Sequence, residues 1–205
     1  MGEPVAKVNQ TPESYSPKDK PLIIKMVQKI NESIPDVPNI EIYQAHREPY
    51  YVLGIENKTL NGTTGDWGAC WSQFFKPGGH DKIKPFLIEQ PLLGVFCQSE
   101  PGYYNYLIGG IVSGVKSIPE GMFMAEFPKT EYSVVTHEWV PSIDEAEKQI
   151  GRIVGYAHGS ELQLPDGYVK YNGPPNPLIF IESYNYDFDN NRFRFEVWLP
   201  IKTKA

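Results

Sequence analysis

The sequence predicts an α+β fold, in which a duplicated unit of two strands, a helix and two further strands forms one antiparallel sheet. Three observations indicate this class. Two segments have the apolar spacing of amphipathic helices, the other ordered segments alternate as strands do, and the same order of elements occurs twice. A local likeness supports the duplication, since PLLGVF at 91–96 matches PLIFIE at 177–182. We expect both helices on one face of the sheet and a ligand groove on the other.

The first half of the duplication spans residues 40–113. Its strands are expected at 39–45, 50–60, 92–98 and 103–113. Between the two strand pairs, a helix carrying Trp71 follows Asp66, a residue that can cap it, and Pro77 ends it. A Pro-Gly turn at 101–102 predicts that the last two strands pair as a hairpin.

The second half spans residues 122–201 and repeats this order. Its strands are expected at 122–127, 132–137, 177–186 and 192–202, and residues 159–176 are expected to form a loop that can include a short strand at 168–171. The first two should pair through a turn at Pro128-Lys129, and the last two through the polar turn 187–191. Apolar spacing over residues 142–157 predicts a helix whose first turn is acidic, which suits the helix dipole.

The N-terminal part is predicted to differ from the rest of the chain. Residues 1–38 form a polar, proline-containing arm and then a short amphipathic helix, because the apolar residues from Leu22 to Ile34 follow helical spacing. Residues 39–205 form the domain. We expect that deletion of residues 1–20 leaves the melting temperature nearly unchanged, since such an arm buries little apolar surface.

The composition excludes several classes of function. The chain has 205 residues and a net charge of −6, which fits one domain without the clustered basic surface that nucleic-acid binding requires. No apolar run could cross a bilayer and the N-terminus lacks the apolar core of a signal peptide, so we expect a soluble cytoplasmic protein. The four histidines are scattered and no phosphate-binding loop occurs, so we expect no metal and no cofactor.

The C-terminal strand pair contains the candidate binding residues. They are Phe180, Glu182, Tyr184, Glu196 and Trp198. Alternation places the first three on one face of their strand and the last two on one face of theirs, and we expect both sets on the open face of the sheet. Aromatic rings beside carboxylates suit a pocket for a partly charged organic molecule. In the alternative interpretation, Glu182 is a partly exposed carboxylate that pairs with Arg194.

Three further segments bear on the family of the chain: YYNYLIGGIVS, IPEGMFMAEFPKTEYSVVTHEW, and IESY followed by FEVWLPIK. Together they are similar to the GyrI-like, or AraC-type, effector-binding family of bacterial domains, over residues 40–202. The resemblance implies tandem SHS2-like units around a groove, where a buried glutamate in a Glu-x-Tyr pattern contacts hydrophobic, often cationic drugs. The pattern falls on Glu182 and Tyr184, and a later family acid on Glu196. Many relatives have another glutamate where this chain has Ile111, which argues against a strong preference for dications.

Two functions follow from this resemblance. The first is small-molecule sensing, by the effector-binding domain of a transcription regulator or by a stand-alone binder. In AraC-type relatives a DNA-binding region precedes this domain, and the 38 residues available here are too few for one, so we expect a DNA-binding domain only in a longer protein. The second is hydrolysis of cyclopropane-bearing alkylating compounds, with Glu182 and Tyr184 as the acid-base pair.

Overall fold

The computed structural model describes residues 23–30, 40–60, 67–76, 78–100, 103–160, 162–171 and 178–204. Its helices are α1 (Trp67–Phe75), α2 (Gly79–Ile83) and α3 (Ile143–His158), and a 3-10 turn covers Lys84–Phe86. Its strands are β1 (Ile23–Ile30), β2 (Ile40–Arg47), β3 (Tyr50–Leu60), β4 (Leu87–Glu100), β5 (Tyr103–Val112), β6 (Phe123–Phe127), β7 (Thr130–His137), β8 (Tyr168–Lys170), β9 (Leu178–Asp187) and β10 (Arg192–Thr203). In this part of the chain, no helix is long and apolar enough to span a membrane.

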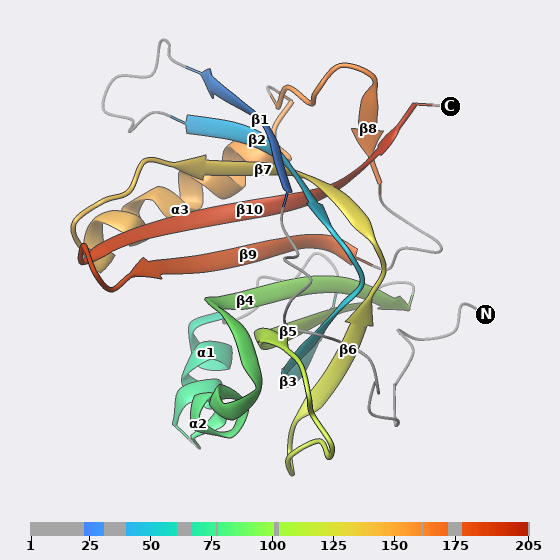
Figure 1. The fold of residues 1–205 in the computed structure, drawn as a ribbon, viewed down its shortest axis with the longest axis vertical. Helices are drawn as coiled ribbons and strands as arrows, with labels where there is room; N and C mark the ends of the chain where they lie inside the picture. The colour runs from blue at the N-terminus through green and yellow to red at the C-terminus, as the bar shows by residue number, and fades with distance from the viewer. Residues whose placement is uncertain are drawn as a thin grey trace.

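The described strands form one antiparallel sheet in the order β1-β2-β7-β10-β9-β4-β5-β3-β6, and β8 pairs with the end of β10. Apart from β1, this order is two-fold symmetric. The first-half strands β2, β3, β4 and β5 have the same positions counted from one end as the second-half strands β6, β7, β9 and β10 have counted from the other end. The duplication predicted from the sequence is therefore confirmed as a two-fold repeat. The pair β4·β9 lies at the centre of the repeat. Figure 1 shows the two halves, with β7, β10 and β9 in one and β4, β5 and β3 in the other. The predicted α+β class is therefore correct.

The predicted hairpin between β6 and β7 is wrong. Strand β6 pairs with β3, where Phe127 lies opposite Tyr50, whereas β7 pairs with β2 and β10 in the other half of the sheet. Tight two-residue hairpin turns need positive φ angles, and a proline has φ fixed near −65°, so Pro128 does not suit such a turn. The link through residues 128–129 instead carries the chain from one half to the other.

The predicted helix over Leu22–Ile34 is also wrong, because Ile23–Ile30 forms strand β1. Its backbone pairs with β2, and Ile30 lies opposite Ile40. Isoleucine and valine are common in this segment and favour strands, and without β1 the edge of β2 would have unpaired backbone groups. The predicted arm over residues 1–20 lies outside the described residues.

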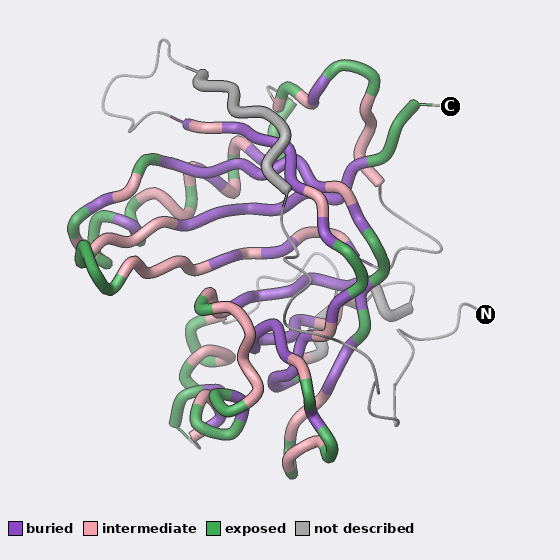
Figure 2. Tube along the Cα trace, viewed as in Figure 1, coloured by how far each residue is buried: buried purple, intermediate pink, exposed green. Residues whose placement is uncertain are grey.

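Both predicted helices are present, and they cover the same face of the sheet. In α3, Ser142 caps the N-terminus and its side chain accepts a hydrogen bond from the backbone N–H of Glu145 at 3.2 Å. The buried side chains Ile153 and Ala157 of α3 belong to one core cluster with Phe195 of β10. The buried Phe74 of α1 and the first-half strands form a second cluster on this face. Figure 2 shows buried residues along most of β2, β7 and β10, and mainly intermediate ones along β9.

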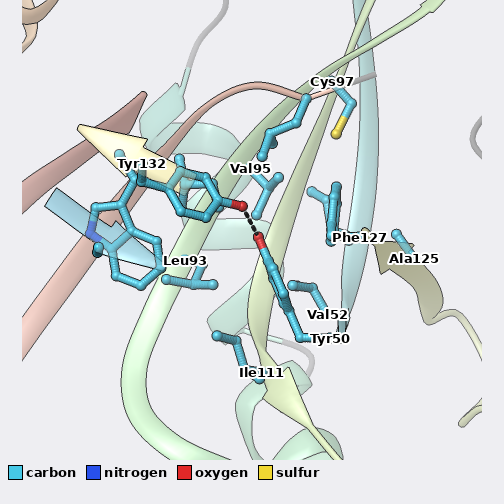
Figure 3. Close-up of a cluster of buried hydrophobic side chains, with 14 of the residues drawn as sticks. Tyr50, Val52, Leu93, Val95, Cys97, Ile111, Ala125, Phe127 and Tyr132 are labelled. Carbon is cyan, nitrogen blue, oxygen red and sulfur yellow. Dashed lines mark hydrogen bonds between the residues drawn. The ribbon is translucent and has the colours of Figure 1, made fainter. Parts of the chain in front are cut away.

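The second face of the sheet, where the groove was expected, is filled by side chains from both halves. The two halves meet at Tyr50 of β3 and Tyr132 of β7, whose hydroxyls hydrogen-bond at 2.8 Å (Figure 3). Ile181 of β9 and Trp198 of β10 belong to the same buried cluster. This face is therefore part of the hydrophobic core. The candidate site lies on the face covered by the helices.

Candidate functional site

Glu182 lies on β9, on the face that α1 and α3 cover. The alternation predicted from the sequence places Phe180 and Tyr184 on the same face, next to it along the strand. Its cross-strand neighbours are Gly94 on β4 and Val197 on β10. Glu182 therefore lies on the central strand pair β4·β9, between the regions covered by the two helices.

Two tyrosine hydroxyls hold the carboxylate of Glu182. The hydroxyl of Tyr106 on β5 donates to Oε2 at 2.9 Å, and that of Tyr184 donates to the same oxygen at 3.2 Å. Trp71 on α1 donates its indole N–H to the hydroxyl of Tyr106 at 3.0 Å. A chain of hydrogen bonds therefore runs from α1 through β5 to the carboxylate. A movement of α1 would change the position of the Tyr106 hydroxyl and so its hydrogen bond to Glu182.

Burial raises the pKa of Glu182 to about 7, although the hydrogen bonds from Tyr106 and Tyr184 act in the opposite direction. The pKa values of both tyrosines are raised, first by burial and then by the carboxylate, so their hydroxyls remain protonated and can donate. No ion pair joins Glu182 to a positive side chain among the described residues. A positive charge brought to this carboxylate would thus meet an acid that is partly ionised at neutral pH.

Aromatic rings surround this carboxylate. The rings of Phe96 and Phe180 stack with centroids 4.2 Å apart. Trp67 lies edge-on to Phe96, and Trp71 lies edge-on to the ring of Tyr184 at 4.9 Å. Such ring faces attract organic cations and exclude water, so the surroundings of Glu182 suit a hydrophobic, positively charged molecule.

A glycine makes the close approach of these groups possible. A Cβ atom at Gly94 would lie 2.4 Å from the hydroxyl of Tyr106 and 2.9 Å from Oε2 of Glu182, both far inside normal contact distances. Because Gly94 has no side chain, the tyrosine hydroxyl and the carboxylate can meet above β4. Gly94 therefore belongs to the site, although it offers no functional group.

The prediction that Glu196 and Trp198 share a face with Glu182 is wrong. Asp187 pairs with Arg192, so the turn between β9 and β10 has four residues, 188–191, and even-numbered residues of β9 lie opposite odd-numbered residues of β10. Directly opposed residues point to the same face, which puts Glu196 and Trp198 on the second face.

On that second face, Glu196 is already paired. Its Oε1 accepts hydrogen bonds from the hydroxyl of Tyr43 at 3.0 Å and from Arg194 at 2.7 Å, and its Oε2 accepts one from the indole of Trp198 at 2.8 Å. The guanidinium of Arg194 also lies over the ring of Trp139. The alternative pair of Arg194 with Glu182 is thus not formed, because the two side chains lie on opposite faces.

Two residues of the site, Tyr106 and Trp71, were not among the candidates predicted from the sequence. Alternation along a single strand cannot show which face of a sheet a tyrosine occupies, and the contact with Glu182 depends on β4 lying between β5 and β9. The only sequence signal that pointed to this contact was the likeness between residues 91–96 and 177–182, which suggested that β4 and β9 have equivalent places in the two halves. Ile111, noted as a departure from the family pattern, lies in the second-face core.

Comparison with protein families gives one match that covers most of the domain. The model of a family described as integron-associated effector binding protein matches residues 41–201. This span contains every residue of the site around Glu182. Comparison with curated proteins gave no match.

Several solved structures share the fold. The structure of SAV2435 bound to tetraphenylphosphonium is 14% identical, covers 78% of this chain and 93% of that chain, and gives a TM-score of 0.59. A putative bacterial transcription regulation protein from Staphylococcus aureus is 13% identical, with coverages of 80% and 97% and a TM-score of 0.53. An integron cassette protein from the mobile metagenome of Vibrio cholerae is 10% identical, with coverages of 78% and 95% and a TM-score of 0.50. At these identities the likeness shows a common fold.

Proposed function

The chain belongs to the family of integron-associated effector binding proteins, and from this we propose that it binds a hydrophobic organic cation at Glu182. One observation carries the proposal: the carboxylate of Glu182 is held by two tyrosine hydroxyls among aromatic rings, and no positive side chain of the described residues pairs with it. A partly buried carboxylate without a cation is destabilised by desolvation, and a ligand cation would offset that cost.

The site residues have distinct roles in this proposal. Glu182 supplies the negative charge, and the hydroxyls of Tyr106 and Tyr184 keep the carboxylate oriented. Phe180 and Trp71 offer ring faces and edges to the apolar part of the ligand. The fold-level neighbour bound to tetraphenylphosphonium supports this ligand class, since that molecule carries one delocalised positive charge on four aryl rings.

Effector binding suggests a regulatory role. We assign the chain as an effector-binding unit that acts either alone or with a DNA-binding partner, without contacting nucleic acid itself. The fold shared with a putative bacterial transcription regulation protein supports such a role. In either case the primary event is recognition of a small molecule, which can be measured on the isolated chain.

The test is calorimetric titration with tetraphenylphosphonium and with a neutral compound of the same shape, tetraphenylmethane made soluble by sulfonamide groups. Glu182→Gln keeps the shape of the side chain and removes its charge. We expect it to weaken binding of the cation by about 10- to 100-fold, which is the value of a charge-assisted contact, and to leave the neutral compound unaffected.

Glu196→Gln is the matched control, because Glu196 is a buried glutamate on the opposite face of the sheet. This variant should bind the cation as the wild type does, provided that its melting curve shows a folded protein. Equal cation affinities for wild type and Glu182→Gln would refute the proposed site.

A second function, hydrolysis, is favoured by one specific observation. A carboxyl group with a pKa of about 7 can act as a general base at neutral pH, and the hydroxyl of Tyr184 lies within hydrogen-bond reach of it. In that reaction Glu182 would take a proton from water while Tyr184 donates one to the opening ring of a cyclopropane-bearing compound. Incubation with such a compound, followed by mass spectrometry, separates the functions, since a pure sensor returns the compound unchanged.

A further inference from the structure

An apolar hollow lies between α3 and the end of the β9-β10 hairpin. Its volume is about 230 Å³. Among the apolar and aromatic residues around it are Ile143, Ala146, Ile150, Tyr184, Phe193 and Phe195. Glu147 on α3 adds one carboxylate at the rim, whereas the guanidinium of Arg194, a residue that borders the hollow, pairs with Glu196 on the opposite face of the sheet. The hollow is therefore mainly apolar and suits an uncharged group.

Tyr184 connects this hollow with Glu182. One part of its side chain lines the hollow, while its hydroxyl donates to Oε2 of Glu182 at 3.2 Å. On the side of α1, in contrast, Trp71 packs against the ring of Tyr184 and hydrogen-bonds to Tyr106. A molecule held at Glu182 can thus extend past Tyr184 toward α3 without separating the rings on the side of α1.

The size and the rim of the hollow indicate what it holds. Pockets that hold a complete drug-sized ligand measure about 300–1,000 Å³, so a hollow of 230 Å³ fits one part of such a ligand. Ile143 at the start of α3 is 54% exposed, which is unusual for a large apolar side chain and leaves apolar surface uncovered beside the hollow. An apolar group in the hollow would cover that surface.

We propose that this hollow is a subsite for the apolar arm of the ligand whose positive charge lies at Glu182. The chain then selects cations that carry an aryl or branched alkyl arm on one side of the charge, and Tyr184 lies at the junction of arm and charge. This inference rests on the proposed function, and it adds the position of the arm and the residues of α3 that choose its size.

The test uses three trimethylammonium cations that share one charged group: tetramethylammonium, benzyltrimethylammonium and naphthylmethyltrimethylammonium. Calorimetric titration of the wild type should show that the benzyl compound binds at least about tenfold more tightly than tetramethylammonium, because a buried ring contributes that much. The ratio of these two affinities measures the contribution of the arm, and the affinity of tetramethylammonium measures that of the charge.

Ala146→Leu fills the hollow from α3. It should bring the ratio close to one and leave the affinity for tetramethylammonium unchanged. Ile143→Ser removes a wall at a position that is half exposed, so it should fold normally, and it should lower the ratio several-fold. Phe75→Ser is the matched control, since Phe75 is 51% exposed on α1, and its ratio should equal that of the wild type.

The failure of this inference can be told from the failure of the proposed function. If Glu182→Gln weakens all three cations while Ala146→Leu and Ile143→Ser keep the wild-type ratio, the arm does not lie under α3 and the inference is wrong, although the function stands. If the wild type binds tetraphenylphosphonium but none of the three trimethylammonium cations, the inference is wrong and the function stands, and if it binds neither tetraphenylphosphonium nor these three, both are wrong. A ratio lost in both α3 variants and kept in Phe75→Ser supports the inference.

Discussion

The ionisation of Glu182 is balanced in the free protein. Burial moves its pKa upward from the ordinary value of 4.5, and the hydroxyls of Tyr106 and Tyr184 limit the rise to about 7. A fully apolar surrounding would leave the acid neutral, and a nearby arginine would fix it as an anion. Since neither occurs, the charge of this side chain can respond to a ligand, which is what a sensor of cations requires.

The binding of a monovalent cation should therefore depend on pH through Glu182. Below about pH 7 the carboxyl is protonated in the free protein, and a cation must displace that proton. We expect the affinity for tetraphenylphosphonium to fall toward tenfold per pH unit below pH 7 and to level off above it, with release of up to one proton per site. Titrations in buffers of different ionisation enthalpy measure both quantities.

Glu182→Gln provides the control for this dependence, and its affinity should be flat with pH. His158, whose ring contacts Phe180, does not account for this dependence, because burial lowers its pKa and it is already neutral near pH 7. The stability of the free wild type should change with the opposite sign. As the pH rises, the Glu182 carboxyl ionises near pH 4.5 in the unfolded chain but only near pH 7 in the folded protein. The free energy of unfolding should therefore fall as the pH rises from about 4.5 to 7. A pH-dependent affinity that survives in Glu182→Gln would assign the titration elsewhere.

At the scale of elements, the sequence predicted which residues share a face within one strand but not how two strands register. Alternation correctly grouped Phe180, Glu182 and Tyr184 on β9. The number of residues in the turn between β9 and β10 decides whether Glu196 joins them, and a polar run such as 187–191 does not reveal that number. A change of one residue in the turn would exchange the two faces of β10.

The site also depends on how closely β4 approaches the side chains of its neighbours. A methyl group at Gly94 would collide with the hydroxyl of Tyr106 and with Glu182. Overpacking of this kind costs about 1–3 kcal/mol, so we expect Gly94→Ala to move Tyr106 and to weaken cation binding by about tenfold or more. Calorimetric titration with tetraphenylphosphonium measures the loss.

Gly155→Ala serves as the control for this substitution, since no atom lies within 4 Å of a Cβ there. Gly155 is exposed in α3, where alanine is the better helix former, so this variant should gain up to about 1 kcal/mol of stability and keep the affinity. If Gly94→Ala binds the cation as tightly as the wild type, the hydrogen bond between Tyr106 and Glu182 is not needed for binding.

At the scale of the whole molecule, the duplication could be predicted because each half contains its own periodic signals. The exchange of strands between the halves could not, because short links such as residues 128–129 look like local turns. Strand β2 of the first half pairs with β7, and β6 of the second half pairs with β3. Each of these strands pairs with a strand that is far away in the sequence. Local sequence patterns therefore do not indicate the pairing, which becomes clear only in the complete sheet.

Because β2 lies beside β7, an ion pair between two residues of the first sequence half, Arg47 and Glu89, joins the two halves of the sheet. Arg47 at the end of β2 is 1% exposed, and its Nη1 donates to Oε1 of Glu89 on β4 at 2.8 Å. The guanidinium also lies over the rings of Tyr50 and Trp198. The pair lies against the second-face core and not at Glu182, so it should contribute to the assembly of the two halves rather than to ligand binding.

A double-mutant cycle tests this assignment. Glu89→Leu leaves the charge of Arg47 buried without a partner and should cost about 3 kcal/mol of unfolding free energy in urea denaturation. Arg47→Met leaves Glu89, whose side chain is 20% exposed and can be hydrated, and should cost about 1–2 kcal/mol. The double variant should lose less than Glu89→Leu alone, because it buries no unpaired charge. Additive losses would show that the two side chains act independently, and a weakened affinity for tetraphenylphosphonium in the folded double variant would show that the two faces of the sheet are coupled.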